Sequence, residues 1–203
     1  MDGMRLSLVV LVLLGCGGLF LFVRRKMQLR QRALQASQRG LVEQGQATVL
    51  DLLKKQKWAD AVVAVDAVLA LAALYEPSRQ AELYYYKGFA LEQMKQLEQA
   101  IEAYQKCQAS EAGRAAGKYA PYAAFRQGYL LTQLRWWDEA AEKLQWVIAE
   151  AVHLSMPELH LNALRILLGV HQARGDYTTV LACAQEGLQL ARAMTNEAMM
   201  ALL

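Results

Sequence analysis

Proline, cysteine and histidine are all scarce in this chain of 203 residues, with three of each. The cysteines are isolated from one another and form no C-x-x-C pair, so neither a disulfide framework nor a zinc module is expected. No histidine lies at a metal-binding spacing such as H-E-x-x-H, and no G-x-S-x-G or phosphate-binding loop occurs. The sequence therefore predicts a protein that is not an enzyme and that holds no metal ion or cofactor.

Charged residues are also few, at 20% of the chain, whereas hydrophobic residues make up 55%. That balance is too apolar for a disordered protein. Proline interrupts helices, and the three prolines, Pro77, Pro121 and Pro157, all lie between stretches with helical spacing. No strand-like alternation of apolar and polar residues stands out. The expected fold class is therefore all-α.

A helical pattern of large and small residues recurs from about Gly45 onward. In its clearest copy, between Tyr84 and Cys107, the small residues Gly88 and Ala100 would let two antiparallel helices approach closely. The position of Ala100 recurs with a nearly constant repeat period, as Ala61, Ala100, Ala140 and Val180. A large residue stands three places before each of these, as Trp58, Leu97, Trp137 and Tyr177.

The small residue of the first helix recurs less regularly. Gly88 has a counterpart one repeat period later at Gly128, whereas Gly169 lies one place late and the first copy has Val49. This pattern resembles the tetratricopeptide repeat (TPR), although its period is longer than is usual for that family. Gly175-Asp176-Tyr177 is similar to the turn between the two helices of that repeat. The resemblance implies an α-solenoid of about four helical hairpins over residues 45–203.

The resemblance also implies a binding surface, because the first helix of each hairpin lines the concave face of a TPR-like solenoid. It places five aromatic residues there: Tyr85, Phe89, Tyr122, Phe125 and Tyr129. Aromatic rings are effective anchors for a bound peptide or helix. The places that carry a carboxylate clamp in some family members hold few suitable residues, only Asn162 and Arg165, which favours an apolar ligand. The alternative is that the rings pack between hairpins or under the C-terminal tail.

An uncharged run from Leu6 to Val23 precedes the repeats. Eighteen helical residues at about 1.5 Å each extend about 27 Å, enough to cross the core of a bilayer. Basic residues at Arg24, Arg25 and Lys26 follow at once. Because such residues mark the cytoplasmic flank of a span, we expect a single-pass membrane anchor over residues 1–26, with the repeats on the cytoplasmic side.

A second interpretation of this run stays open. Leu13-Leu14-Gly15-Cys16 resembles the processing site of a bacterial lipoprotein, which would leave Cys16 lipidated and the repeats outside the cytoplasm. The apolar run continues past Cys16 as far as Val23. Since a lipid anchor is normally followed by a polar tether, this continuation favours the transmembrane helix.

Positive charge is concentrated just after the run. The segment from Arg24 to Arg39 has six basic and no acidic residues, although the whole chain carries only +3. We expect residues 27–44 to form a basic juxtamembrane helix, and we expect contact with anionic lipid headgroups at Arg24, Arg25, Lys26, Arg30 and Arg32. No aromatic residues accompany these charges and the remainder is net acidic, so nucleic acid is not an expected partner.

These features together predict a membrane-anchored TPR-like scaffold, adaptor or assembly factor that holds a protein segment in a concave aromatic groove. One alternative is a permanent structural or accessory subunit of a membrane protein complex. Another is a lipid-anchored TPR lipoprotein outside the cytoplasm.

Overall fold

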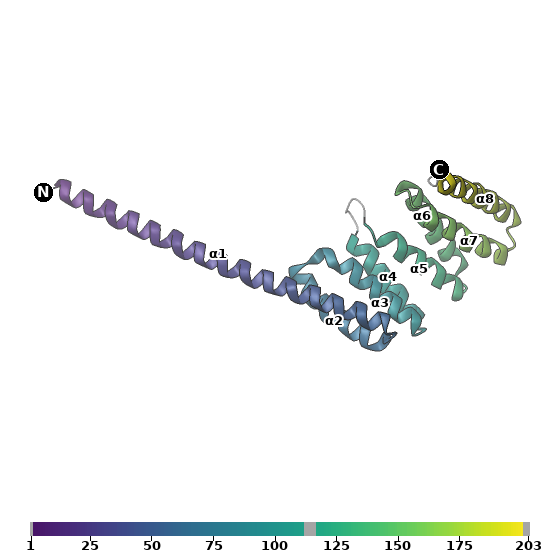
Figure 1. Ribbon diagram of the computed structural model, residues 1–203, viewed down its shortest axis with the longest axis horizontal. Coiled ribbons are helices and arrows are strands. Elements are labelled where there is room, and N and C mark those ends of the chain that lie inside the picture. Colours follow the sequence, from purple (N-terminus) through teal and green to yellow (C-terminus); the bar gives the residue numbers. More distant parts are fainter. Residues whose placement is uncertain (1, 112–116, 201–203) are drawn as a thin grey trace.

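The computed structural model describes the backbone of residues 2–111 and 117–200, and the side chains of residues 25–74, 76–110 and 117–195. Its helices are α1 (Asp2–Lys54), α2 (Trp58–Tyr75), the 3₁₀ turn η1 (Pro77–Arg79), α3 (Gln80–Gln93), α4 (Leu97–Glu111), α5 (Ala120–Gln133), α6 (Trp137–His153), α7 (Pro157–Arg174) and α8 (Tyr177–Met200). They form four successive hairpins (Figure 1). The predicted all-α solenoid of about four hairpins is confirmed.

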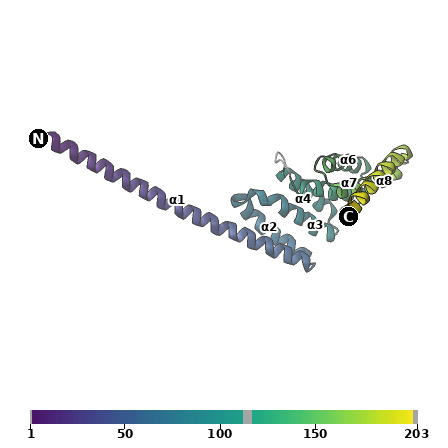
Figure 2. The same ribbon diagram turned by 45° about the horizontal axis from the view of Figure 1, so that its top comes forward.

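The hairpins stack in the order of the sequence. Each helix packs on the next from α1 to α8, and the first helices of successive hairpins also contact one another, as α1 with α3, α3 with α5 and α5 with α7. Within the described residues, contacts between successive second helices are minor or absent. The first helices therefore line the inner side of the array and the second helices form its outer side. Figure 2 shows the helices of the solenoid following one another from α1 at one end to α8 at the other.

The turn inside each hairpin is built on one residue with left-handed backbone geometry. These residues are Gln56 (φ 58°), Lys95 (φ 61°), Arg135 (φ 61°) and Gly175 (φ 74°). They recur with the same period as the alanine position in the sequence pattern, and each precedes that position by five places. Left-handed geometry costs a non-glycine residue about 1 kcal/mol, so only the last of the four turns avoids this strain.

Glycine marks the closest approach of the helices within two hairpins, as predicted. A Cβ on Gly88 would lie 2.6 Å from the ring of Tyr104, and one on Gly128 would lie 3.0 Å from Leu144. In the first hairpin, where the sequence pattern has Val49 in place of a small residue, the glycine in close contact is Gly45, one helical turn earlier, and it faces Val68. The prediction for Gly169 is wrong, because no heavy atom lies within 4 Å of its Cβ position.

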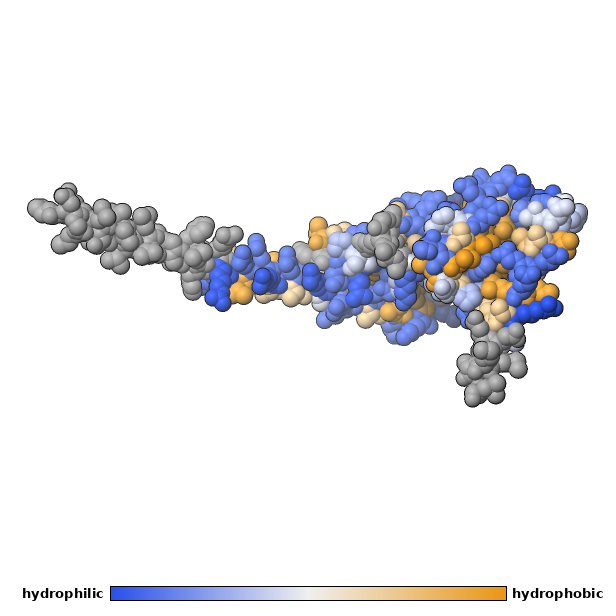
Figure 3. Space-filling model, turned by 90° about the horizontal axis from the view of Figure 1, so that it is seen from above, coloured by the Kyte–Doolittle hydropathy of each residue, from blue (hydrophilic) through white to orange (hydrophobic). Residues whose placement is uncertain are grey.

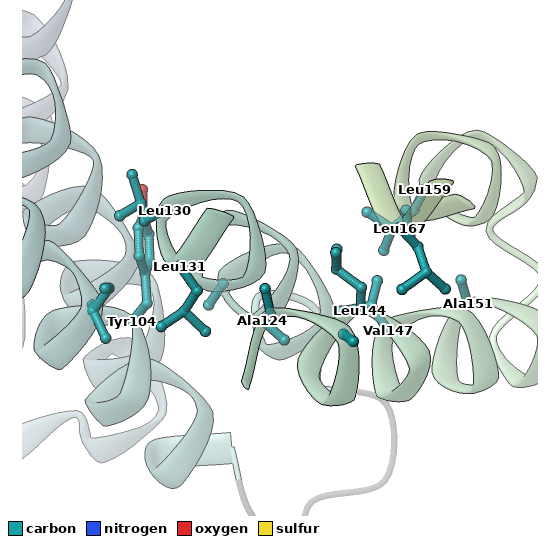
Figure 4. Close-up of a cluster of buried hydrophobic side chains, with 14 of the residues drawn as sticks. Tyr104, Ala124, Leu130, Leu131, Leu144, Val147, Ala151, Leu159 and Leu167 are labelled. Atoms are coloured by element: carbon teal, nitrogen blue, oxygen red, sulfur yellow. The ribbon is translucent and has the colours of Figure 1, made fainter. Parts of the chain in front are cut away.

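A continuous apolar core joins α3 to α8, and Figure 4 shows the part that α4 to α7 contribute. The core alternates small and large side chains, which lets the helices interdigitate. Cys107 and Cys183 are buried in it, as expected for packing residues. A smaller cluster ties the first hairpin to α3, with Val42, Val65 and Leu83 among its members.

Helix α1 runs without a break through both expected domain boundaries, at residues 26/27 and 44/45, and extends far beyond the solenoid (Figure 1). Its side chains become buried from Val42 onward, so packing on the solenoid begins close to the expected residue 45. The predicted membrane span, residues 6–23, lies outside the residues whose side chains are described. Among the described residues, no helix is long and apolar enough to cross a bilayer.

Candidate functional site

The aromatic residues predicted for the concave face lie on α3 and α5, two of the first helices. Tyr85 and Phe89 on α3 are matched one repeat period later by Phe125 and Tyr129 on α5, and all four are half-buried. Tyr122 lies one turn before Phe125 and is 40% exposed. The spacing of three and four residues puts each set on one side of its helix. The inner side of the second and third hairpins therefore carries partly exposed aromatic side chains.

Tyr85 fills the space between α3, α4 and the start of α5. Its ring centroid lies 6.2 Å from that of Tyr86, 5.8 Å from that of Tyr104 and 5.6 Å from that of Tyr119. Such separations are those of ring pairs that attract one another. Tyr85 thus has a packing role, and the part that remains exposed is what a ligand could reach.

Phe89 lies between α2 and α5. Trp58 meets it edge to face at 5.8 Å between centroids. From the other side the guanidinium of Arg126 lies 5.7 Å from the ring centroid, in cation–π contact. Both of the α3 rings are therefore held by neighbours from other helices, as the alternative interpretation of these rings expected.

Glu92 on α3 is a buried carboxylate that contacts residues on both neighbouring helices, α4 and α5. The Glu92 carboxylate accepts a hydrogen bond of 2.9 Å from the Tyr104 hydroxyl and pairs with Arg126 at 3.2 Å. Glu92 is 8% exposed and Tyr104 is fully buried. Burial, with the nearby Glu92 charge, raises the pKa of Tyr104, which therefore stays a neutral donor. Sequence reasoning missed this group, although a glutamate directly after the apolar residues Phe89-Ala90-Leu91 was a usable signal.

A second carboxylate, Glu82, lies one turn before Tyr86 on α3. Its Oε1 atom accepts hydrogen bonds from the hydroxyls of Tyr86 (2.7 Å) and Tyr119 (2.6 Å). Arg79 lies 3.7 Å from its other oxygen. Burial favours the protonated acid, but the bonds from Tyr119 and Tyr86 outweigh it and lower the pKa of Glu82 below its usual 4.5. Glu82 therefore fixes the start of α5 to α3.

Glu82→Gln is expected to destabilise the fold at neutral pH and to matter less in acid. Because the folded-state pKa is lowered, the stability from ionised Glu82 is complete above the unfolded pKa near 4.5 and is lost as the pH falls through the folded value. Urea unfolding of wild type and variant from neutral pH to about pH 3 measures this. The gap between the two midpoints should close on acidification, and a gap that does not depend on pH would contradict this role of Glu82.

The inner side of α7 differs from that of α3 and α5. Asn162, Arg165 and Gly169 are not buried, and they stand one repeat period after Tyr122, Phe125 and Tyr129. That spacing corrects the sequence prediction, because Gly169 is the counterpart of an inner-face ring rather than a displaced packing glycine. A glycine inside a helix costs about 1 kcal/mol relative to alanine, and no neighbour in the described structure requires it here. The inner face is thus aromatic over two hairpins and open and polar on the fourth.

The basic residues assigned to the lipid surface lie on the part of α1 that extends beyond the solenoid. Arg25, Lys26, Arg30 and Arg32 are exposed, and Arg24 lies outside the described side chains. The aromatic and basic sites are therefore far apart, with the basic residues on the extended part of α1 and the rings in the solenoid (Figure 1).

No known protein-family model matches the chain, and no curated protein sequence is similar to it. Several solved structures are similar in fold. The apo form of RapI superposes with a TM-score of 0.69 at 13% identity, over 76% of this chain and 57% of RapI. TPR-like repeats of a putative kinesin light chain from Podosopora anserina give 0.61 at 16% identity, over 76% of each chain.

A third similar structure is the Rap conjugation gene regulator of plasmid pLS20 in complex with the Phr* peptide. It gives a TM-score of 0.55 at 16% identity, over 70% of this chain and 40% of the regulator. The chain thus spans little more than half the length of RapI and less than half of this regulator. At such identities the likeness concerns the fold alone, and it shows that this chain is an α-solenoid of TPR-like repeats.

Proposed function

We propose that this protein is a scaffold or adaptor that binds an extended or helical segment of another protein on the inner face of its solenoid. The observation that carries the proposal is the change along that face from aromatic side chains on α3 and α5 to polar side chains on α7. Partly exposed rings on α3 and α5 suit apolar side chains of a ligand, and Tyr122 is exposed enough to be a first contact. A similar solenoid, the Rap regulator, was solved in complex with a peptide.

The polar end of the inner face suits a peptide rather than a small apolar molecule. Asn162 carries an amide that can both donate to and accept from a peptide backbone, and Arg165 can pair with an acidic side chain. The open space above Gly169 leaves room for a side chain of the ligand. The bound segment therefore carries apolar residues along hairpins two and three and an acidic or polar residue at α7.

The proposal includes a membrane anchor. Residues 6–23 cross the membrane once, and the repeats lie on its cytoplasmic side. The uncharged run and the exposed cations from Arg25 to Arg32 support this arrangement. Because α1 continues unbroken into the first hairpin, residues 24–41 form a stalk about 27 Å long between bilayer and solenoid.

The role of a permanent subunit of a membrane complex is supported by one observation on that stalk. Met27, Leu34 and Leu41 recur every seven residues and are 60%, 59% and 46% exposed. A single helix with such a stripe is covered in many assemblies by a neighbouring helix. An adaptor would be purified largely alone in detergent, whereas a permanent subunit would come with partners in fixed ratio.

A photo-crosslinking amino acid at Tyr122 tests binding on the inner face in intact membranes. It is expected to link the full chain to a discrete protein, and Arg165→Ala in the same chain should lower the yield severalfold. Trp146 is the matched control, because it is 44% exposed but lies on α6, a second helix. Equal adducts from Tyr122 and Trp146, or no effect of Arg165→Ala, would count against an inner-face ligand.

A further inference from the structure

The last helix carries an exposed apolar stripe, which we call the α8 stripe: Tyr177, Leu181, Ala184 and Leu188. Its three large members are 71%, 61% and 52% exposed. Spacings of four, three and four residues put all four side chains on one face of the helix. Figure 3 shows apolar surface at this end of the solenoid, far from α1. Large exposed apolar stripes are uncommon on monomers and mark interaction surfaces.

Comparison with the equivalent positions on α4 and α6 shows that the α8 stripe corresponds to a face that is covered in the earlier hairpins. Leu181 has counterparts at Ile101 on α4 and Ala141 on α6, which are only 7% and 5% exposed. The counterpart of Leu188 on α4 is Gln108, whose side chain donates a 2.8 Å hydrogen bond to Gln127 on α5, in the next hairpin. The face of a second helix that bears these positions is therefore covered by the following hairpin. On α8 the same face is present, and no helix of the described chain covers it.

The other end of the solenoid does not match this surface. The exposed side chains of α1 beside the first hairpin include Gln44, Thr48 and Asp51, and Asp51 pairs with Lys55 at 2.7 Å. Such a polar face is typical of a terminal cap. It would leave polar groups against the apolar α8 stripe, so copies of this chain cannot lengthen the array by stacking head to tail. The partner surface has to be apolar itself.

The α8 stripe is free of charge and complementary to itself in size. Glu186 is the one charged residue between Tyr177 and Ala191, and its carboxylate is turned away from the stripe, 2.8 Å from Nε2 of His160. Two stripes can therefore meet without like-charge repulsion. In an antiparallel pair with the two-fold axis midway between Leu181 and Ala184, large Leu181 faces small Ala184 at the centre of the contact, and the two large residues Tyr177 and Leu188 face one another at its ends.

We propose that the α8 stripe binds the α8 stripe of a second copy, giving a two-fold dimer joined at the C-terminal ends of the two solenoids. In it Leu181 packs on the partner's Ala184, and Tyr177 packs on the partner's Leu188. The stripe spans twelve residues, about 16 Å of helix from the first to the last, so the contact is small and reversible. The inner faces of both solenoids stay free in such a dimer, because α8 is a second helix.

The full chain in detergent tests this by sedimentation and light scattering at increasing micromolar concentration. Wild type is expected to double its protein mass, and Leu181→Glu with Leu188→Glu should keep the protein monomeric. Both residues are exposed, so the circular dichroism spectrum should not change. Val63→Glu is the matched control, because Val63 is 71% exposed on the outer helix α2 and should leave the dimer intact.

Disulfide trapping tests the antiparallel geometry. Mixed chains with Leu181→Cys and Ala184→Cys are expected to crosslink severalfold more than either chain alone. A wild type that stays monomeric throughout, or a dimer that survives the double glutamate variant, would overturn the proposal. So would a stripe-dependent complex with a different protein in place of the dimer.

Discussion

Gly88→Ala is expected to destabilise the solenoid by about 2 kcal/mol, although alanine is the better helix former. The added methyl group would lie 2.6 to 2.9 Å from three ring atoms of Tyr104. That ring is fully buried, and its hydroxyl is held by Glu92, so it cannot move away without breaking a hydrogen bond. The midpoint of urea unfolding, followed by circular dichroism, measures the loss.

Gly169→Ala is the matched control, since it makes the same chemical change in the interior of another first helix. No heavy atom lies within 4 Å of its Cβ position, so the helix propensity of alanine acts alone and should stabilise the fold by about 1 kcal/mol. The two variants should therefore shift the midpoint in opposite directions. Shifts of the same sign would contradict either the close contact of Gly88 with Tyr104 or the open space at Gly169.

Glu92→Ala is expected to cost about 3 kcal/mol of unfolding free energy, near the lower end for a broken buried pair. The substitution leaves the buried Tyr104 hydroxyl without its acceptor and removes the carboxylate that pairs with Arg126. Arg126 is 33% exposed and can still reach water, which is why the higher end of the range is not expected. Urea unfolding of the full chain gives the value.

Tyr104→Phe provides the internal check on this result. In that background no hydroxyl is left unpaired, so Glu92→Ala should cost clearly less than it does in wild type. Glu102→Ala is the surface control, because its carboxylate pairs with Lys106 at 2.7 Å but is 63% exposed. Equal costs for Glu92→Ala in both backgrounds would mean that the Tyr104 bond contributes nothing, and a large effect of Glu102→Ala would mean that the assay does not distinguish buried from exposed pairs.

Much of the fold was predictable because its signals are local and periodic. The spacing that relates Ala61, Ala100 and Ala140 gave the number of hairpins and the position of each turn, which the left-handed residues then matched. Gly88 and Gly128 were predicted as close-approach positions because a small residue on a helical stripe has few other reasons to recur.

The first and last hairpins departed from prediction because they have only one neighbour. In the first hairpin the glycine in close contact is Gly45, one turn before Val49, the residue that the repeat pattern aligns with Gly88. In the last hairpin Gly169 belongs to the inner face, and only its place one repeat period after Tyr129 could have shown this. A repeat pattern describes an internal unit better than a terminal one.

The sequence by itself determined that this chain forms helical hairpins, where each one turns, and which side chains share a face of its first helices. These features depend on helical spacing and turn geometry, which involve residues only a few places apart. The tertiary structure decided which aromatic side chains are already in contact with other helices. Phe89 meets Trp58 and Arg126, and Tyr104 meets Glu92, through contacts between helices that the sequence pattern treats as separate units. It also decided that one face of α8 stays uncovered, because burial of a side chain depends on what stacks beside its helix and not on the residue itself.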